Sequence, residues 1–430
     1  MKKIAFVSHG CAKNLVDTEL MLGVLSENGY DVTLDETESD IVVVNTCSFI
    51  HDAEKEAVQS ILSLVNSGKR VIVAGCLAQK YGAELKKAIP EISALVGTTD
   101  FVKLPEIIST AEYTEKVSEL PDYIYPENIE RKQITAGSSS YIKIADGCNY
   151  ACGYCIIPQL RGKYHSRKIE DIVKEAQNLA NKGVSEIILI AQDTTSYGID
   201  LYGKPKLSGL LEKLNDIENL SRIRFMYAYP TQVSNELLDT INRCEKTVKY
   251  IDIPLQHSHP EVLKRMKRPV LDYEKLIENI RNRVPNVALR TAFIVGYPAE
   301  TEEEFRHLYD FVEKMEFDKM GVFEYSREKG TFSYGLKPQV PKKIMHERSK
   351  ELMALQKGIS KKINENHIGE TIPCLIENVS DNGEATARTP FDAPEVDGLV
   401  YIKTDIPVIP GEIYDVKITG CDEYDLWGVI

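Results

Sequence analysis

The chain has 430 residues, of which 43% are hydrophobic and 27% are charged. That length allows two or three domains, each with its own core, and the ordinary composition excludes extended disorder. No segment approaches the ~18–20 apolar residues of a membrane-spanning helix, and the apolar run near the N-terminus is too short for an export signal. Nine cysteines without such a signal predict a cytoplasmic protein that has no disulfide framework and no membrane contact.

Charge is unevenly spread along the chain. The 52 basic and 65 acidic residues give a formal net charge of −13. The stretch from His367 to Ile430 holds 13 acidic and 3 basic residues, so −10 of that charge lies there. A strongly acidic module repels phosphate backbones and attracts basic partners, and a merely solvated face is the alternative interpretation.

The first hundred residues alternate short apolar runs with amphipathic stretches, which is typical of a parallel sheet covered by helices. Helices are expected to begin near Asn14, Asp52 and Ala78, with Asn14 as an N-cap. The predicted strands are Lys3–Ser8, Ile41–Asn45 and Arg70–Ala74.

Each of these strands is followed by a cysteine, namely Cys11, Cys47 and Cys76. Because the carboxyl ends of parallel strands share one edge of a sheet, these thiols are predicted to converge there. Taken singly, each would be read as a small buried hydrophobe, but three at equivalent strand ends favour ligands of one cluster. Cys244, Cys374 and Cys421 have no such equivalence and are predicted to be structural.

From Leu104 the chain becomes charged, contains proline and is weakly periodic, so a linker is expected over Leu104–Thr135. Strand and helix patterns alternate beyond it and predict an incomplete parallel barrel whose active site opens at the carboxyl ends of the strands. The predicted strands are Tyr141–Ala145, Glu186–Ala191, Ile223–Tyr227, Tyr250–Pro254, Ala288–Val295 and Lys319–Tyr325. The predicted helices include Ile169–Asn181, Asn235–Arg243, Glu274–Arg283, Glu302–Met315 and a long one over Pro341–Asn366.

The loop after the first barrel strand carries Cys148, Cys152 and Cys155, with no nearby fourth cysteine. Three thiolates leave one iron of a four-iron cluster without a protein ligand, free to bind and reduce another molecule. Zinc is the first alternative, although a structural zinc site needs paired ligand spacings that are missing here. A trio of buried core thiols is the second, although three within eight residues beside glycines cannot all face a core.

Residues 367–430 contain five short strand patterns in about sixty residues, which is typical of a small closed barrel of the OB-like kind. Such a barrel is normally a binding module. The predicted strands are Thr371–Asn378, Ala385–Arg388, Leu399–Lys403, Ile413–Thr419 and Asp425–Val429.

The C-x3-C-x2-C run, with Tyr154 before its last cysteine, resembles the signature of the radical S-adenosylmethionine (radical SAM) enzymes. The three-part layout resembles their methylthiotransferase branch. This resemblance implies an α/β fold with a flavodoxin-like N-terminal domain (1–115), a linker (116–135), a partial (β/α)6 TIM-like radical SAM domain (136–366) and a TRAM domain (367–430).

The resemblance also implies two 4Fe–4S clusters per chain, an auxiliary one on Cys11, Cys47 and Cys76 and one on the loop cysteines that cleaves S-adenosylmethionine. One S-adenosylmethionine would methylate a sulfur and another would yield a 5′-deoxyadenosyl radical, so no general acid or base is assigned. Residues at the expected barrel opening are predicted to line the S-adenosylmethionine pocket, namely Tyr154, Gln192, Asp193, Arg290 and Gly296. A flavodoxin- or ferredoxin-like electron donor is expected.

Within this family, segments 10–14, 393–398 and 423–428 resemble the branch that modifies the β-carbon of an aspartate in the twelfth protein of the bacterial small ribosomal subunit. Ala12 departs from the proline common in the family. The acidic C-terminal module agrees with a basic protein substrate, either free or bound to the ribosome, and does not favour RNA. The alternatives are a MiaB-like tRNA adenosine methylthiotransferase, which predicts a basic TRAM face, and a non-catalytic iron–sulfur electron carrier, which needs no open iron.

Overall fold

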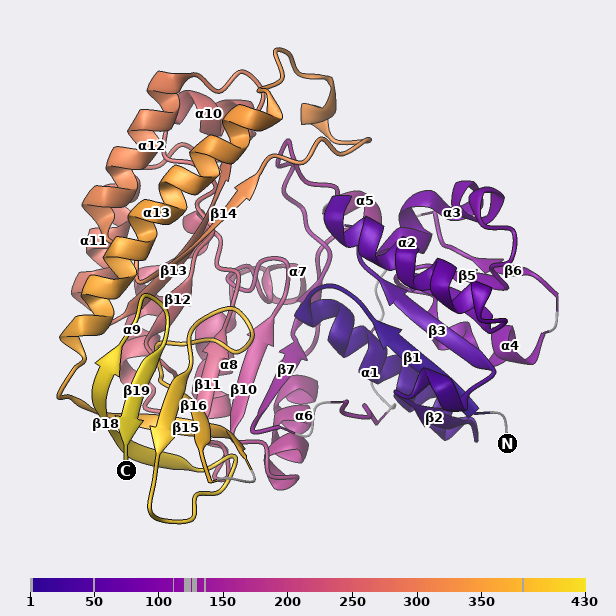
Figure 1. Cartoon of the computed structure of the whole chain (residues 1–430), viewed down its shortest axis with the longest axis horizontal. Helices are drawn as coiled ribbons and strands as arrows, with labels where there is room; N and C mark the ends of the chain where they lie inside the picture. The colour runs from indigo at the N-terminus through magenta and orange to yellow at the C-terminus, as the bar shows by residue number, and fades with distance from the viewer. Residues whose placement is uncertain are drawn as a thin grey trace. The chain divides into compact units, whose positions relative to one another are not determined.

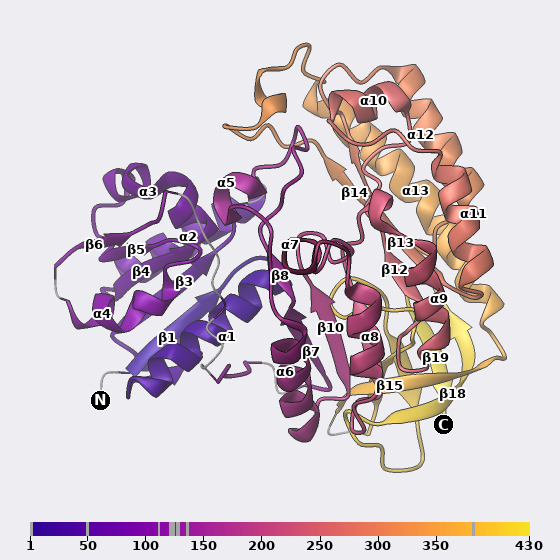
Figure 2. The same ribbon diagram turned by 180° about the vertical axis from the view of Figure 1, so that it is seen from behind.

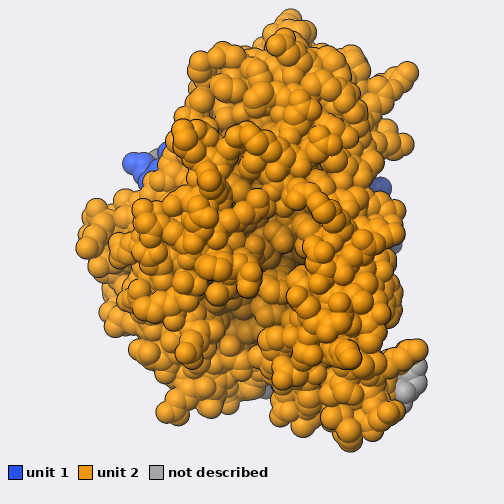
Figure 3. Space-filling view, turned by 90° about the vertical axis from the view of Figure 1, so that its left-hand side faces the viewer, with its two compact units in different colours: residues 1–136, 145–167, 328–331 blue, residues 137–144, 168–327, 332–430 orange. Residues whose placement is uncertain are grey.

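The computed structural model describes residues 3–48, 51–110, 112–119, 125, 130–134, 137–380 and 383–430. The chain divides into two compact units, which Figure 3 distinguishes by colour. Unit 1 comprises residues 1–136, 145–167 and 328–331, and unit 2 comprises residues 137–144, 168–327 and 332–430. Within the described ranges, no helix combines the length and the apolar character that crossing a membrane requires.

Unit 1 is built on a six-stranded parallel sheet with the strand order β2-β1-β3-β4-β5-β6 (Figure 1). Its strands are β1 (Lys3–Ser8), β2 (Asp31–Thr33), β3 (Ile41–Thr46), β4 (Arg70–Gly75), β5 (Ala94–Val96) and β6 (Thr114–Lys116). Its longer helices are α1 (Ala12–Glu27), α2 (His51–Asn66), α3 (Cys76–Ala88) and α4 (Leu104–Ser109). Apolar residues of α2 and α3 share one buried core with alternate residues of β3 and β4, and the parallel sheet predicted from the sequence is thereby confirmed.

Two local predictions in this unit were wrong. The expected linker does not begin at Leu104, because Leu104, Ile107 and Ile108 are buried in α4 and because β6 pairs with β5. Asn14 is not an N-cap, because α1 already begins at Ala12 and the Asn14 side chain is buried. A short amphipathic turn and a three-residue edge strand carry too little periodicity to be distinguished from a linker.

The cysteine loop, residues 145–167, also belongs to unit 1. It contains β8 (Ala145–Asp146), α5 (Ile157–Arg161) and β9 (His165–Ser166), and β8 pairs with β9. Helix α5 contacts α3, and the Thr98 hydroxyl donates a hydrogen bond to the Leu160 carbonyl at 2.7 Å. Ile156 and Leu160 pack against Cys76 in a small apolar cluster. Both sets of cysteines therefore lie within one compact unit.

Unit 2 contains six parallel strands in two hydrogen-bonded groups, β11-β10-β7 and β12-β13-β14, with β11 next to β12. Figure 2 shows the labelled strands β7, β10, β12, β13 and β14 of these groups. The predicted incomplete parallel barrel is confirmed. Its strands are β7 (Ser139–Lys143), β10 (Glu186–Ile190), β11 (Arg222–Phe225), β12 (Tyr250–Asp252), β13 (Ala288–Val295) and β14 (Lys319–Glu324). Its helices are α6 (Ile169–Asn181), α7 (Ile199–Tyr202), α8 (Leu207–Asn215), α9 (Asn235–Arg243), α10 (Pro260–Arg265), α11 (Tyr273–Arg283), α12 (Glu302–Met315) and α13 (Lys342–Asn366).

The C-terminal part of unit 2 is a closed five-stranded barrel with the order β15-β16-β17-β19-β18, as predicted. Its strands are β15 (Thr371–Val379), β16 (Ala385–Arg388), β17 (Val400–Lys403), β18 (Ile413–Cys421) and β19 (Leu426–Val429). Apolar residues that alternate along these strands fill its interior. This small barrel will be called the TRAM-like barrel.

The TRAM-like barrel packs against the amino ends of the parallel strands, on the side opposite their carboxyl ends. Glu186, the first residue of β10, is fully buried, accepts a hydrogen bond from Arg224 at 2.9 Å and pairs with Arg388 of the TRAM-like barrel. Burial opposes ionisation of Glu186, but the charges of Arg388 and Arg224 outweigh it and lower its pKa to about 2. Lys319, the first residue of β14, likewise pairs with Asp392 at 2.6 Å. Charged pairs therefore hold the TRAM-like barrel to the amino ends of the parallel strands.

Candidate functional site

Cys11, Cys47 and Cys76 lie at the carboxyl edge of the unit 1 sheet, after β1, β3 and β4. Cys11 is exposed, whereas Cys47 and Cys76 are buried. Gly10 allows the first two loops to touch: its φ is +99°, and a Cβ atom there would lie 2.5 Å from the Cβ of Cys47. The structure thus brings the three strand ends together, while their role as cluster ligands stays a prediction.

Asn14 ties the loops of Cys11 and Cys47 to each other. Its side-chain amide donates hydrogen bonds to the carbonyls of His9 and Thr46, both at 3.0 Å. His9 lies two residues before Cys11, and Thr46 immediately precedes Cys47. With both amide hydrogens committed, the side-chain oxygen of Asn14 is left to face Arg161, whose guanidinium donates to it at 2.7 Å.

The surroundings of two of these thiols shift their pKa values in opposite directions. Burial raises the pKa of Cys76, and the nearby charge of Arg161 only partly offsets it. For Cys11 the surrounding protein atoms also oppose ionisation, but the charges of Lys13 and Arg161 outweigh them and lower the pKa. The thiol of Cys11 therefore loses its proton more readily than that of Cys76.

This donor set, three cysteine thiols, is of the kind that binds a four-iron cluster. Among the residues that the structure describes, no three His, Cys, Asp or Glu side chains come close enough to hold one ion. In a four-iron cluster each cysteine binds a different iron, so the thiols need to surround a larger object and need not meet at one point. Three thiols that follow neighbouring strands at one sheet edge suit such a cluster.

Cys148, Cys152 and Cys155 are each partly buried in a loop that folds back on itself. The Cys148 amide donates to the Gly162 carbonyl at 3.1 Å, and the Cys155 amide donates to the Cys152 carbonyl at 3.1 Å. The Tyr150 amide also donates to the Cys148 sulfur at 3.4 Å. Tyr154 lies between the last two cysteines and is partly buried. These backbone bonds hold the three thiols within one short loop.

The remaining predicted pocket residues lie in unit 2, at two different levels of the parallel strands. Gln192 and Asp193 follow β10 and Gly296 follows β13, all at carboxyl ends. Asp193 is buried, and its carboxylate accepts hydrogen bonds from the Thr195 amide at 2.9 Å and from the Ser196 hydroxyl. The Asp193 carboxylate therefore organises its own loop.

Gly296 and Arg290 also have contacts within the protein. A Cβ atom on Gly296 would lie 2.3 Å from the Met345 side chain of α13, so glycine is required there by packing. Arg290 lies toward the amino end of β13 and pairs with Asp252 at 3.0 Å and with Asp397 of the TRAM-like barrel at 3.5 Å. The contacts of these residues with S-adenosylmethionine stay predictions.

Sequence reasoning missed Arg161 and the role of Asn14. Arg161 ends α5, is 3% exposed and contacts residues from three separate segments of unit 1. The sequence offered a weak signal, because the short helical turn that precedes Arg161 is mostly apolar. Its partners, however, are more than 80 positions away in three of four cases, and only the fold brings them together.

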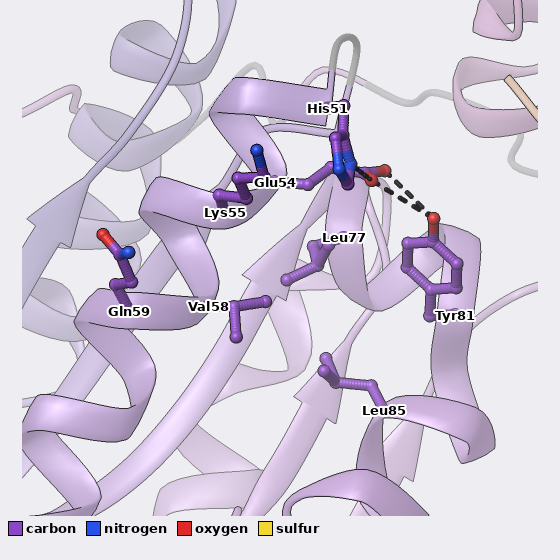
Figure 4. A pocket seen from close by; sticks show the side chains of 8 residues that line it. All are labelled: His51, Glu54, Lys55, Val58, Gln59, Leu77, Tyr81 and Leu85. Atoms are coloured by element: carbon purple, nitrogen blue, oxygen red, sulfur yellow. Dashed lines mark hydrogen bonds and ion pairs between the residues drawn. The ribbon is translucent and has the colours of Figure 1, made fainter. Parts of the chain in front are cut away.

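Two surface cavities lie outside the cysteine sites. A cavity of about 330 Å³ opens between α2 and α3, with Val58, Leu77 and Leu85 on its apolar side and Glu54 and Tyr81 hydrogen-bonded to each other (Figure 4). None of its lining residues is a cysteine.

The second cavity, which we call the TRAM groove, has a volume of about 310 Å³ and lies on the TRAM-like barrel. It is lined by Asn378, Ser380, Glu384, Ala385, Thr386, Tyr401, Ile402, Lys403 and Trp427.

Aromatic rings dominate the TRAM groove. The rings of Tyr401 and Trp427 stack with their centroids 5.9 Å apart and their planes 24° from parallel. The two residues are 40% and 39% exposed, so their rings are open to a binding partner. Glu384 adds an acidic group to the same groove. Since Lys403 also lines it, the groove offers flat apolar faces beside one acidic and one basic group.

Three family models match successive parts of the chain. Residues 3–97 match the uncharacterised protein family UPF0004, residues 142–312 match the radical SAM superfamily, and residues 368–430 match the TRAM domain. Of the solved structures, the radical S-adenosylmethionine methyltransferase TsrM from Kitasatospora setae, with cobalamin and a [4Fe-4S] cluster bound, resembles the chain with a TM-score of 0.55. It is 15% identical, and the match covers 86% of this chain and 76% of that one, so this likeness shows the fold alone.

Relatives of much higher identity span the whole chain. The ribosomal protein uS12 methylthiotransferase RimO of Thermoanaerobacter sp. (strain X514) is 46% identical over 436 residues, covering 100% of both chains. The protein of the same name from Microcystis aeruginosa (strain NIES-843 / IAM M-2473) is 46% identical over 431 residues, covering 99% of this chain and 98% of that one. As its motifs predicted, the chain therefore belongs to the family of the ribosomal protein uS12 methylthiotransferases RimO, within the radical SAM superfamily.

Proposed function

We propose that this protein transfers a methylthio group to the β-carbon of an aspartate in ribosomal protein uS12. The observation that carries the proposal is the 46% identity, over the full length of both chains, to a protein named for this activity on uS12. The bound cofactors, two 4Fe–4S clusters and S-adenosylmethionine, would supply the radical, the sulfur and the methyl group, chemistry that no side chain can perform.

The two cysteine sets support two clusters with different duties. The loop of Cys148, Cys152 and Cys155 offers three thiols for four irons, which leaves a position for S-adenosylmethionine. Cys11, Cys47 and Cys76 offer a second set at the sheet edge for the auxiliary cluster. The protein's own contribution is to hold both sets in one compact unit, because effective transfer requires reacting groups at fixed distance and orientation.

The proposal assigns a different role to each part of the chain. Residues 1–115 would carry the auxiliary cluster, residues 136–366 the radical chemistry and residues 367–430 the recognition of substrate, with 116–135 as the linker. The matches to three family models fall inside these limits. The open groove on the TRAM-like barrel supports the last assignment.

A basic protein suits the TRAM-like barrel better than RNA does. The net charge of −10 over residues 367–430 repels a phosphate backbone and attracts lysine and arginine side chains. The stacked rings of Tyr401 and Trp427 add faces on which a cationic side chain can rest. The tRNA-modifying alternative is not favoured, because the full-length relatives are named for uS12. A flavodoxin- or ferredoxin-like electron donor and a cytoplasmic location stay predictions.

The test offers both substrates to one preparation. The chain is reconstituted without oxygen using iron and sulfide, then given reductant, S-adenosylmethionine, a uS12 peptide and a tRNA anticodon stem-loop together. Mass spectrometry is expected to find a mass increase of one methylthio group on the peptide aspartate alone. The same group on the RNA alone would contradict the proposed substrate and leave the radical chemistry intact.

A further inference from the structure

One buried arginine connects the two cysteine sets within unit 1. Arg161 is 3% exposed, and its guanidinium donates hydrogen bonds in several directions. The acceptors are Asp17 Oδ2 at 2.7 Å, Asp146 Oδ2 at 3.0 Å, Asn14 Oδ1 at 2.7 Å and Cys76 Sγ at 3.7 Å. Four acceptors for one guanidinium use most of the five N–H groups that arginine offers, so its orientation is fixed.

Three of these acceptors belong directly to cysteine loops. Asp146 lies two residues before Cys148, and its other oxygen accepts a hydrogen bond from the Gly147 amide at 2.9 Å. Asn14 holds the carbonyls that precede Cys11 and Cys47, and Cys76 is itself an acceptor. Arg161 therefore contacts the Cys76 sulfur directly, reaches the backbone of the Cys11 and Cys47 loops through Asn14, and reaches the start of the Cys148 loop through the Asp146 carboxylate.

The charge of Arg161 acts in the same place. A cluster bound by thiolates becomes more negative when it is reduced, and hydrogen bonds to its sulfur ligands, together with local charge, set its potential. The guanidinium faces Cys76 Sγ and is the cation held between the buried carboxylates of Asp17 and Asp146. Losing it removes a positive charge from beside those two carboxylates and the sulfur.

We propose that Arg161 is a positioning residue that locks the Cys148 loop against the Cys11, Cys47 and Cys76 set and that its hydrogen bond to Cys76 raises the reduction potential of the auxiliary cluster. The inference rests on the proposed function, because it requires that cluster. No part of the proposed reaction otherwise assigns a duty to Arg161.

The potential can be measured on the auxiliary cluster by itself. In the full chain carrying Cys148→Ala, Cys152→Ala and Cys155→Ala, the remaining cluster is reconstituted and titrated by electron paramagnetic resonance under controlled potential. Arg161→Gln is expected to shift the midpoint to a more negative value. Arg161→Lys keeps the charge but not the fork of donors, so a smaller shift in the same direction is expected.

A matched variant tests the opposite sign. Asp17→Asn keeps Arg161 and removes one adjacent negative charge, so the midpoint is expected to move to a more positive value. If Arg161→Gln binds no iron, Arg161→Lys and Asp17→Asn still decide between the outcomes. The electrostatic part of the inference would be overturned if the midpoint potential stayed at the value of the unsubstituted Arg161 protein. It would also be overturned if Asp17→Asn and the Arg161 variants moved that potential in the same direction.

Positioning is tested in the chain with all cysteines present. Arg161→Lys is expected to raise the number of 5′-deoxyadenosine molecules released for each methylthio product several-fold, because a loosened loop generates radicals that miss the substrate. An unchanged ratio would overturn the positioning part. Failure of the proposed function has a different signature: the triple cysteine variant would then bind no cluster at all, whereas failure of this inference alone leaves the cluster bound with an insensitive potential.

Discussion

The two sets of cysteines reach their places by different routes. Cys148, Cys152 and Cys155 lie within eight consecutive residues, and backbone hydrogen bonds of the loop itself hold them together. Cys11, Cys47 and Cys76 are separated by tens of residues and meet only because β1, β3 and β4 are neighbours in a parallel sheet. A contiguous site survives local changes elsewhere, whereas a site assembled by topology depends on every loop that contributes to it.

The largest expected effect separates the two sets by chemistry. Cys152→Ala should abolish the release of 5′-deoxyadenosine, because the open iron is lost with its cluster. Cys47→Ala should leave that release intact and abolish the methylthio product. Chromatography of nucleosides and mass spectrometry of the peptide measure the two outcomes. Wild-type product from Cys47→Ala would contradict the auxiliary assignment.

A change in unit 2 provides a reference that touches neither set. Glu186→Gln leaves Arg224 and Arg388 facing each other without their buried carboxylate and is expected to cost about 3–5 kcal/mol of unfolding free energy. Trp427, the single tryptophan of the chain, reports the unfolding of the TRAM-like barrel by fluorescence. Glu377→Gln removes a partner of Arg388 that is 25% exposed and should cost less than Glu186→Gln does.

Lowering the pH should destabilise the protein by protonating the carboxylate of Glu186. The pKa of Glu186 falls from an ordinary value of 4.5 to about 2 in the folded protein. Its stabilising contribution is therefore complete above pH 4.5 and is lost as the pH falls toward 2. Stability of the wild type measured by Trp427 fluorescence should decline over that interval more steeply than that of Glu186→Gln. Parallel declines would show that Glu186 does not anchor the TRAM-like barrel.

A glycine pair tests how far the dispersed set depends on its loops. Gly10→Ala introduces a side chain at φ +99° that would lie 2.5 Å from Cys47 Cβ, whereas Gly68→Ala has a φ of +79° and no atom within 4 Å. In both variants, backbone strain should lower the free energy of unfolding by about 1–3 kcal/mol. Only Gly10→Ala should also lose iron from the auxiliary set. Equal iron contents in the two variants would show that the Cys11 loop can accommodate the added side chain and still bind iron.

The smallest expected effect lies at the TRAM groove. Trp427→Ala removes one of the two stacked rings and should raise the KM for a uS12 peptide several-fold, with 5′-deoxyadenosine release in the absence of peptide unchanged. Tyr424→Ala is the matched control, because Tyr424 is 51% exposed and does not line the groove. Equal KM values for both variants would move substrate recognition elsewhere.

The fold could be predicted in most of its parts because its elements are strongly periodic. The strands Lys3–Ser8, Ala288–Val295 and Ala385–Arg388 and the helix Glu302–Met315 have the predicted bounds. Elements that lack periodicity were missed: α4 and β6 have few residues, and tertiary contacts hold them in place. The long-range pairing of Glu186 with Arg388 could not be predicted either, since neither residue carries a local signal of its partner.

The candidate site divides in the same manner. The loop cysteines follow from spacing alone, and the sheet-edge cysteines follow from the rule that parallel strands end at one edge. The predicted pocket residues rested on position along a strand, which does not say how a side chain is engaged. Arg290 illustrates the limit: its place within β13 suited a ligand, yet its partners in the structure are Asp252 and Asp397.

The central claim is that two independent cysteine sets each hold a four-iron cluster, and counting iron tests it most directly. Anaerobically reconstituted wild-type protein should contain about eight irons per chain, and the triple alanine variants of either set about four each. The two half-loaded proteins should together reproduce the Mössbauer spectrum of the wild type. A wild-type chain with about four irons, all of which one triple variant loses and the other keeps, would contradict the account.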